Sequence, residues 1–304
     1  MTALDLPNAV TSYAEQLDRD GIVVVPRFVQ GAMLAGMQRA FARALERPRW
    51  NNFDGYSKTE LYRHMVEDVL MLDQGFVDFA LHPVIVQTVR EYVGDNVQLR
   101  EAKGWLSKPT TRDFHGWHGD AWYDQTQVTD RIPREVKAAL YLTDVRSGAF
   151  EYLKGTHRKE APRPVRNSDI GTKWHGEMAQ ALGPAGTLIL FDTSGIHRQG
   201  VPMLERRHAI FYNYHQPDVP LQREDVVAYR YHPLLLNAAF LGGLSEDDMR
   251  LLGFGDQTHY QPDFRRPPKH EGFQAAIRTA YDVKLTLADL PRRVKDVLRP
   301  ILKR

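Results

Sequence analysis

Between residues 95 and 220 the sequence is a series of short apolar runs separated by Gly, Pro, Asp and Asn. Several of these runs alternate apolar with polar residues or are rich in β-branched and aromatic residues, which is typical of strands. The runs are NVQLREAKGWLS, VKAALYLTDV, GAFEYLKG, GTLILFDTS and RHAIFYNYH. Short strands at this spacing are expected in a barrel or a sandwich. The middle of the chain therefore predicts an all-β core.

The flanks of this core have the periodicity of helices instead. Residues 8–47 read as helical apart from the β-branched run IVVVPRF, which Pro26 closes. Residues 60–94 carry more helical signal, with Pro83 in a first-turn position. Near the C-terminus, LSEDDMRLLGFG and TLADLPRRVKDVLRPILKR read as helices, and QPDFRRPPKHEGF between them reads as a loop.

The length of 304 residues allows one large domain or two of average size. We find no internal repeat or low-complexity segment, and we expect a single domain over residues 1–304. Its parts would be helical support in 1–94, the β core with the functional site in 95–220, and a mixed region in 221–304 that ends in helix.

The composition excludes several kinds of chemistry. The chain has no cysteine, which removes disulfide frameworks, thiolate zinc sites, iron–sulfur clusters and thiol nucleophiles. The formal net charge of +2 gives no reason to expect nucleic acid or an anionic membrane as a partner. The N-terminus lacks the features of a secretory signal, and no apolar run approaches the roughly 18 residues of a spanning helix. We therefore expect a cytoplasmic protein, in which any metal is held by His and carboxylate.

The stretch FHGWHGDAWYDQ, residues 114–125, contains a candidate metal-binding pair. His118 and Asp120 are separated by one residue, so their side chains point the same way if the segment is extended. An H-x-D pair alone is common by chance. The neighbouring His115 lies three residues before His118, a spacing that suits a helix face better than a strand, and we do not count it as a ligand.

A third ligand candidate lies in GTLILFDTSGIHRQG. His197 follows an apolar strand, Thr187 to Phe191, and a polar turn, so it stands at the mouth of a strand. Alone, such a histidine would be read as a solvated loop residue. Two histidines and one carboxylate on one face of an ion, however, form the triad of non-haem Fe(II) oxygenases, which leaves positions open for a cosubstrate and O₂.

Arg206 and Arg207 stand at the entrance of the strand in VPMLERRHAIFYNYH. Arginine is suited to a bidentate grip on a carboxylate. A dicarboxylate that chelates iron at one end would need such a partner at the other. Adjacent arginines at the start of a strand are usually solvated surface residues. The presence of the metal triad favours the other interpretation, in which one of them binds a carboxylate of the cosubstrate.

The sequence resembles the phytanoyl-CoA dioxygenase family of Fe(II)/2-oxoglutarate oxygenases over most of its length. The resemblance is carried, in the family's order, by DGIVVVPRF, SKPTTRDFHGWHGD, ALYLTDVRSGAFEYLKGTHR, GTLILFDTSGIHRQG and RRHAIFYNYH. It implies a mostly β fold with helical flanks and a double-stranded β-helix (jelly-roll, cupin-like) core. It also implies Fe(II), 2-oxoglutarate and O₂. His118, Asp120 and His197 match the metal ligands, and Arg207 matches the arginine that holds the far carboxylate of 2-oxoglutarate, with Arg206 as the alternative.

Other positions match the family less directly. The family commonly has Ser two residues after the distal histidine, where this chain has Gln199, which can still donate a hydrogen bond to the cosubstrate. Gly148 and Gly155 match turn glycines, and Thr156-His157 matches a signature that we interpret as structural. In related halogenases a small residue replaces the carboxylate ligand, so the presence of Asp120 favours hydroxylation or a related oxidation.

The substrate, expected to be a small molecule, cannot be identified from the motifs, because the family's substrates range from acyl-CoA thioesters to amino-acid derivatives, natural products and phosphonates. For the aromatic candidates the alternative role is core packing, for His115 it is orienting a metal ligand, and for Lys108 it is a solvent-facing position. The segment DFRRPPKHEGF could cover an anionic substrate, although a solvated loop is preferred. The substrate candidates near the triad are Trp117, Trp122, Tyr123 and His115, and Lys108 is a candidate for contacting an acidic group of the cosubstrate.

Two other functions stay open at this point. A metalloenzyme could use the same two-histidine, one-carboxylate site without 2-oxoglutarate, as an isomerase or an extradiol-type oxygenase. It would have no need of a buried Arg207. A non-catalytic binding module of the same fold would be expected to have lost at least one ligand, and none is lost here. A zinc hydrolase fits less well, because the spacing of His115, His118 and Asp120 differs from the common hydrolase clusters.

Overall fold

The computed structural model describes residues 9–46, 62–66, 69–120, 122–159, 164–221 and 234–254, with residues 276, 279–280, 283–284, 287, 290–291 and 294 nearer the C-terminus. The last group is helical, and residues 287, 290–291 and 294 fall within the helix expected at TLADLPRRVKDVLRPILKR. The loop expected at QPDFRRPPKHEGF lies outside the described residues.

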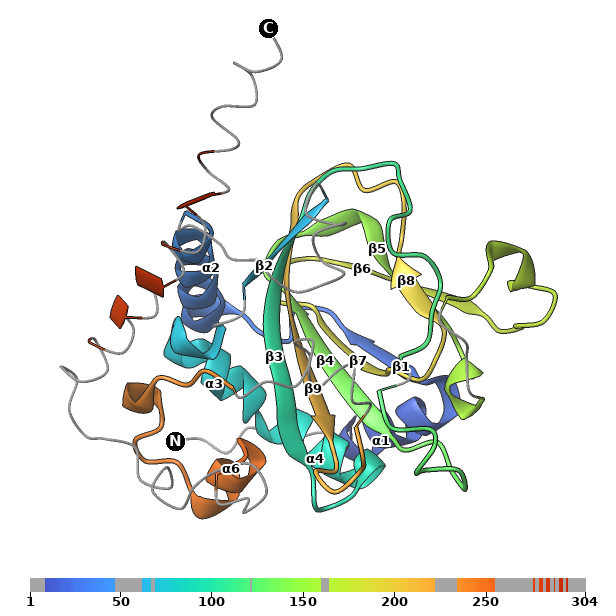
Figure 1. The fold of residues 1–304 in the computed structure, drawn as a ribbon, viewed down its shortest axis with the longest axis horizontal. Coiled ribbons are helices and arrows are strands. Elements are labelled where there is room, and N and C mark those ends of the chain that lie inside the picture. Colours follow the sequence, from blue (N-terminus) through green and yellow to red (C-terminus); the bar gives the residue numbers. More distant parts are fainter. Residues whose placement is uncertain are drawn as a thin grey trace, which may run out of the picture.

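In these described segments, nine strands form two antiparallel sheets (Figure 1). The larger sheet has the order β1-β7-β4-β9-β3-β2, and the smaller sheet has the order β6-β5-β8. The strands of the larger sheet are β1 (Ile22–Val25), β2 (Arg63–Val66), β3 (Gln98–Ser107), β4 (Glu135–Tyr141), β7 (Leu188–Asp192) and β9 (Arg207–His215). Those of the smaller sheet are β5 (Val145–Leu153), β6 (Met178–Gly183) and β8 (His197–Gln199).

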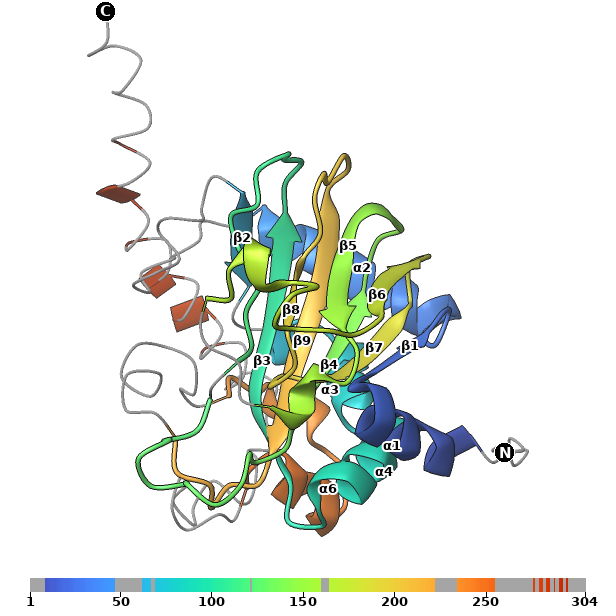
Figure 2. The same ribbon diagram turned by 90° about the vertical axis from the view of Figure 1, so that its right-hand side faces the viewer.

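The helices cover one face of the larger sheet, and the smaller sheet lies on its other face (Figures 1 and 2). A large apolar cluster joins the helices to the covered face. The α-helices with named bounds are α1 (Ala9–Asp20), α2 (Gly31–Leu45), α3 (Gln74–Ala80), α4 (Pro83–Val93) and α6 (Glu246–Leu251). Single 3₁₀ turns occur at Val69–Met71, Thr156–Arg158, Asn167–Asp169 and Ala238–Phe240.

The helix ends follow from local sequence signals. Gly21 follows α1 with a φ of 79°, a conformation that suits glycine. Pro83 is the first residue of α4, as the sequence predicts, and the side chain of His82 caps the helix by accepting from the Val84 N–H. Ser245 forms a capping box at the start of α6.

The pleat of the larger sheet sends alternate side chains to the helices and to the smaller sheet. On β4, Val136 and Ala138 belong to the cluster under the helices, whereas Ala139 and Tyr141 pack toward the smaller sheet. Lys137 shares the second face and lines a cavity between the sheets. The inner face of the larger sheet is therefore partly apolar and partly charged.

One expectation from the sequence was wrong. Residues 60–94 carry helical periodicity, but Arg63–Val66 form β2, an edge strand paired with β3. A four-residue segment has weak intrinsic preference, and pairing with a long neighbouring strand overrides it. The N-terminal region thus adds two strands, β1 and β2, to the core as well as its helices.

In the described part of the chain, no helix is long and apolar enough to span a bilayer.

Candidate metal centre and cavity

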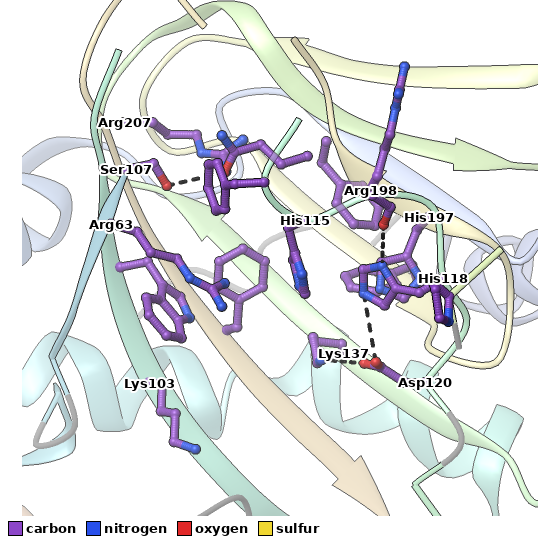
Figure 3. Close-up of a pocket in the computed structure, with 18 of the residues that line it drawn as sticks. Arg63, Lys103, Ser107, His115, His118, Asp120, Lys137, His197, Arg198 and Arg207 are labelled. Carbon is purple, nitrogen blue, oxygen red and sulfur yellow. Dashed lines mark hydrogen bonds and ion pairs between the residues drawn. The ribbon is translucent and has the colours of Figure 1, made fainter. Parts of the chain in front are cut away.

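A cavity of about 480 Å³ lies between the two sheets (Figure 3). Most of its wall comes from the inner faces of β3, β4 and β9, from β8, and from the segment that contains the H-x-D pair. The lining residues are Arg63, Glu101, Lys103, Trp105, Ser107, Phe114, His115, Gly116, His118, Asp120, Lys137, Phe150, Pro164, Phe191, His197, Arg198, Gln199, Arg207 and Phe211.

Three of the predicted residues meet at one end of this cavity. His118, Asp120 and His197 each offer a ligand atom, and these atoms lie within 4.8 Å of one another. All three side chains are buried. Their main chains bring them together: the His118 N–H donates to the His197 carbonyl at 3.1 Å, and the His197 N–H donates to the His118 carbonyl at 2.8 Å.

The imidazole rings are oriented by nearby carbonyls. Nδ1 of His118 lies 2.7 Å from the Gly116 carbonyl oxygen, and Nδ1 of His197 lies 2.8 Å from that of Gly195. A carbonyl can only accept, so each Nδ1 carries the hydrogen and each Nε2 keeps its lone pair. Outer contacts of this kind fix the tautomer and the ring orientation of metal-ligating histidines. The two rings thus fit a metal ion.

Asp120 completes the group and is itself held by a lysine. Its Oδ1 lies 3.8 Å from His118 Nε2, and its Oδ2 accepts from Lys137 Nζ at 3.0 Å (Figure 3). Oδ2 of Asp120 is thus held by Lys137, whereas Oδ1 faces His118 and is the oxygen placed to bind a metal. Two imidazoles and one carboxylate oxygen suit a divalent first-row metal that retains open coordination positions.

Arg207 lies in another part of the cavity wall, at the start of β9, and is buried. Its Nη1 donates to the Gly148 carbonyl at 2.9 Å, and its Nη2 donates to Gln199 Oε1 at 2.8 Å. Its Nε is buried without a hydrogen-bond partner among the described residues. Burial lowers the pKa of the guanidinium, because desolvation disfavours its charged form. The guanidinium is therefore suited to an incoming carboxylate.

A second arginine stands beside this group. The strand register places Arg63 opposite Ser107 and Ser107 opposite Arg207, so the three residues form one row across β2, β3 and β9. The Ser107 hydroxyl donates to Gln199 Oε1 at 3.3 Å. The guanidinium of Arg63 lies over the Trp105 ring, 4.3 Å from its centroid. The sequence analysis did not identify Arg63, because it lies in the unpredicted strand β2.

The other candidate residues from the sequence analysis differ in whether they line the cavity. Arg206 is exposed, and Lys108 follows β3 outside the cavity lining. His115 does line the cavity, with its ring 4.3 Å from that of His118. Gly148 supports Arg207 through its carbonyl, and Thr156 Oγ1 accepts from the Ile196 N–H, a structural role.

The three aromatic candidates beside the H-x-D pair lie outside the cavity lining. Trp117 packs in a small apolar cluster and supports the guanidinium of Arg198, which lies 4.4 Å from its ring centroid. Trp122 and Tyr123 are buried together in another cluster, with Trp122 also against His215. These positions correspond to core packing, the alternative that the sequence left open.

Several charged residues of the cavity were missed. Glu101 and Lys103 form a buried ion pair on β3, and Arg198 pairs with Asp113 and Glu151. One signal was available in the sequence. Residues 101, 103, 105 and 107 in EAKGWLS alternate as a polar or amphipathic set, and a lone lysine interrupts VKAALY. Charged residues at alternate positions of an otherwise buried strand indicate a face that lines a polar cavity.

Comparison with known families decides what kind of protein this is. Residues 17–200, more than half of the chain, match the phytanoyl-CoA dioxygenase family. The chain belongs to this family. The match includes the triad and ends before Arg207. A sequence comparison with curated proteins finds no match. Membership of the phytanoyl-CoA dioxygenase family supports an iron- and 2-oxoglutarate-dependent oxygenase.

Solved structures with a similar fold include members of that enzyme class. The epimerase SnoN, in complex with Fe³⁺, alpha ketoglutarate and nogalamycin RO, is 19% identical, with 69% of this chain and 84% of that chain covered and a TM-score of 0.53. EctD from S. alaskensis, with 2-oxoglutarate and 5-hydroxyectoine, is 21% identical, with 74% and 85% covered and a TM-score of 0.56. The carbocyclase SnoK from nogalamycin biosynthesis is 16% identical, with 73% and 92% covered and a TM-score of 0.54. The likeness confirms the double-stranded β-helix fold expected for a phytanoyl-CoA dioxygenase family member.

Proposed function

We propose that this protein is an Fe(II)/2-oxoglutarate-dependent dioxygenase that hydroxylates a C–H bond of a small molecule. One observation carries the proposal: a two-histidine, one-carboxylate group and a buried arginine, Arg207, share one cavity. A metal site alone would suit several enzyme classes. The buried arginine adds a carboxylate site, which a 2-oxoglutarate enzyme needs and the alternative metalloenzymes do not.

In this proposal each residue has a stated role. His118, Asp120 and His197 hold Fe(II), with the imidazoles oriented through Gly116 and Gly195. When bound, Fe(II) and 2-oxoglutarate activate O₂ for oxidation of a C–H bond, with release of succinate and CO₂.

Arg207 binds the far carboxylate of 2-oxoglutarate through Nε and the N–H groups that Gly148 and Gln199 leave available. Gln199 and Ser107 position that guanidinium. Gln199 occupies the position where the family commonly has Ser, and its Oε1 already accepts from Arg207. It therefore acts on the cosubstrate through the arginine.

Aromatic rings surround the His197 ligand candidate. Phe150, Phe191 and Tyr152 surround the His197 ring at centroid distances of 5.4, 5.2 and 6.4 Å. Apolar rings next to the reacting centre exclude water from it and strengthen the charged contacts inside the site. This favours oxidation of the bound substrate over loss of the oxidant to solvent.

Hydroxylation is the finer part of the proposal. The structurally similar proteins include an epimerase and a carbocyclase, so the fold permits other outcomes. Asp120 supports hydroxylation, because a carboxylate in this position leaves no ligand site for a halide. The proposal also retains one domain over residues 1–304, a cytoplasmic location, and a small-molecule substrate as the partner.

Anaerobic titration of the Fe(II)-loaded protein with 2-oxoglutarate tests the proposal. The expected result is a weak visible metal-to-ligand charge-transfer band in the wild type. The variant Arg207→Ala should need far more 2-oxoglutarate to give the band, while Arg206→Ala, which removes the exposed neighbour, should behave as the wild type does. If iron binds and no band appears, the site belongs to a metalloenzyme that does not use 2-oxoglutarate. If iron does not bind, a non-catalytic binding module is favoured.

A further inference from the structure

We propose that Asp192 and Tyr92 are positioning residues of the metal centre. The Tyr92 hydroxyl holds the Asp192 carboxylate, and Asp192 fixes a turn that orients two of the three metal ligands. This inference rests on the ligands assigned in the proposed function, and it extends the site to two residues outside the cavity lining. It is carried by the burial of Asp192, by the hydrogen bonds of the turn, and by the contact of Tyr92 from α4.

The first argument is the position of Asp192. It is the last residue of β7, and the pleat places it on the same face as Leu188 and Leu190, which pack under the helices. Its side chain therefore points away from the cavity into an apolar layer, where it is only 3% exposed. Aspartate is almost never buried to this degree unless its carboxylate is paired or hydrogen-bonded. A carboxylate at this position therefore needs a structural reason.

The second argument is the turn that follows Asp192. Residues 193–196 connect β7 in the larger sheet to β8 in the smaller sheet, and His197 is the first residue of β8. Asp192 Oδ1 accepts from the Ser194 N–H at 2.8 Å, and the Asp192 carbonyl accepts from the Gly195 N–H at 3.3 Å. A buried N–H needs an acceptor, and the carboxylate supplies it for Ser194. Asp192 therefore closes the turn from its N-terminal end.

Two carbonyl groups of this turn contact the metal ligands. The Thr193 carbonyl accepts from the Asp120 N–H at 2.7 Å, and the Gly195 carbonyl oxygen lies 2.8 Å from His197 Nδ1. The first contact places the main chain of one ligand, and the second orients the ring of another. Outer contacts of ligands influence the affinity of a metal site. A change in the conformation of the turn would thus displace both ligands together.

The third argument is the contact from α4. The Tyr92 hydroxyl donates to Asp192 Oδ2 at 2.7 Å, and both side chains are buried. Burial raises the pKa of Asp192, and the hydrogen bond from Tyr92 is the largest effect that opposes this rise. The Tyr92 ring is itself held by Arg134, whose guanidinium lies 4.3 Å from its centroid. The helix layer is therefore connected to the metal ligands through Asp192.

Fe(II) affinity tests the proposal. An anaerobic chelator competition would compare the wild type with Asp192→Ala, Asp192→Asn and Tyr92→Phe. Asp192→Ala should weaken Fe(II) binding by about tenfold or more, because loss of an outer contact of a ligand has an effect of this size. Asp192→Asn should stay within about threefold of the wild type, since its amide can accept from the Ser194 N–H and donate to the Tyr92 oxygen. Tyr92→Phe should lie between these two variants.

The matched control is Tyr214→Phe. The Tyr214 hydroxyl also joins the larger sheet to a helix, but it donates to the Ala80 carbonyl of α3, at 2.9 Å, rather than to the turn. Urea unfolding should show a loss of stability in Tyr214→Phe and in Tyr92→Phe, because each removes one buried hydrogen bond. Fe(II) affinity should fall only in Tyr92→Phe.

Two results of this comparison would overturn the proposal. One is an equal Fe(II) affinity of Tyr92→Phe and Tyr214→Phe, and the other is an equal loss of affinity in Asp192→Asn and Asp192→Ala. Tyr92→Phe and Asp192→Asn keep the shape of the wild-type side chains, so they decide the question if Asp192→Ala fails to fold.

A second measurement uses the metal-free protein. At pH 8, ¹⁵N NMR of histidine-labelled protein reports which ring nitrogen of His197 carries the hydrogen, and His197→Gln identifies the signal. The wild type and Tyr214→Phe should carry it on Nδ1, which faces the Gly195 carbonyl. Asp192→Ala should show a mixture of both tautomers, and Tyr92→Phe a smaller share of the second. A wild type without Fe(II) binding would refute the proposed function, whereas a single Nδ1–H tautomer in both variants would refute the positioning role.

Discussion

His118 and His197 are paired through their main chains, with reciprocal N–H to carbonyl hydrogen bonds of 3.1 and 2.8 Å. The pair also continues the smaller sheet, since His197 is opposite Tyr152 on its other side. Two ligand candidates far apart in the sequence are thus held side by side by main-chain hydrogen bonds. The backbone fixes their spacing, and the carbonyls of Gly116 and Gly195 fix their rings.

Because the pairing uses main-chain atoms, His197→Ala should remove Fe(II) binding without unfolding the protein. The expected result is a far-UV circular dichroism spectrum like that of the wild type, with no saturable iron binding in an anaerobic chelator competition. His115→Ala provides the matched control. His115 lines the same cavity and contacts His118, but it lies outside the triad, so this variant should still bind iron. Equal loss in both variants would contradict the assignment of ligands.

Lys137→Met should destabilise the metal-free protein and increase its response to metal. The substitution leaves the buried Asp120 carboxylate without the ammonium 3.0 Å away, and breaking a buried pair typically costs roughly 3 kcal/mol or more. A divalent ion supplies positive charge at the same carboxylate. Calorimetric melting should therefore show a lower Tm without metal and a larger rise with Fe(II) than in the wild type.

The control for this prediction is Lys173→Met. Lys173 forms a surface ion pair with Asp169 at 3.8 Å and has a largely exposed side chain, so its removal should change stability by well under about 1 kcal/mol. A Lys137→Met protein whose Tm responds to Fe(II) no more than the wild type would show that the lysine does not compensate Asp120.

Gly195→Ala and Gly104→Ala should both lower the stability of the protein, but only Gly195→Ala should also weaken iron binding. A Cβ at Gly195 would lie 1.9 Å from the Tyr152 hydroxyl, and a Cβ at Gly104 would lie 2.3 Å from Phe41 on α2. Both Gly→Ala variants should lose roughly 1–3 kcal/mol of unfolding free energy through overpacking. Gly195 also holds the His197 ring, so only its variant should lose iron affinity, by roughly tenfold. Urea unfolding and iron titration of both proteins check this, and equal iron affinities would refute the ring-orienting role.

The stability of the protein should fall as the pH drops below about 6.5. Burial lowers the pKa of His82, whose Nδ1 accepts the Val84 N–H at the start of α4. Below the ordinary histidine pKa the unfolded chain therefore binds more protons than the folded chain, and protonation also removes the cap. His208 contributes in the same direction, because burial and then the charge of Arg206 lower its pKa.

His82→Asn tests this pH dependence, because asparagine can cap the helix without titrating. Urea unfolding at pH 8, 7, 6 and 5 should show a weaker loss of stability toward acid in this variant than in the wild type. His175→Asn, which changes an exposed histidine, should keep the wild-type profile. An unchanged profile in His82→Asn would mean that the acid sensitivity comes from other groups.

Local patterns were sufficient for most of the elements. Alternation and β-branched residues indicated β3, β4, β5, β7 and β9 but not β6, and Pro83 marked the start of α4. The metal candidates were also visible, because an H-x-D pair and a histidine just after an apolar strand are features of neighbouring residues. The fold class followed from the same patterns and from the family resemblance, and the structure agrees with it.

Residues whose role depends on facing the cavity were harder to find. Arg63 was missed because a four-residue strand has no clear periodicity of its own, and only pairing with β3 puts it beside Ser107. Trp117 and Trp122 lie next to the metal candidates in sequence, yet both pack into apolar clusters away from the cavity. Proximity along the chain did not predict proximity in space for these side chains.

By itself, the sequence determined most of the strands, the start of α4 and the three metal candidates, because each depends on propensity, capping or spacing between near neighbours. The tertiary structure decided that Arg207 is buried in the cavity wall while Arg206 is exposed, and that Arg63 joins the same row. In a strand, a shift of one residue moves a side chain to the opposite face. Which face meets the cavity is set by pairing with distant strands and by packing of the two sheets, and no local stretch of the chain contains that information.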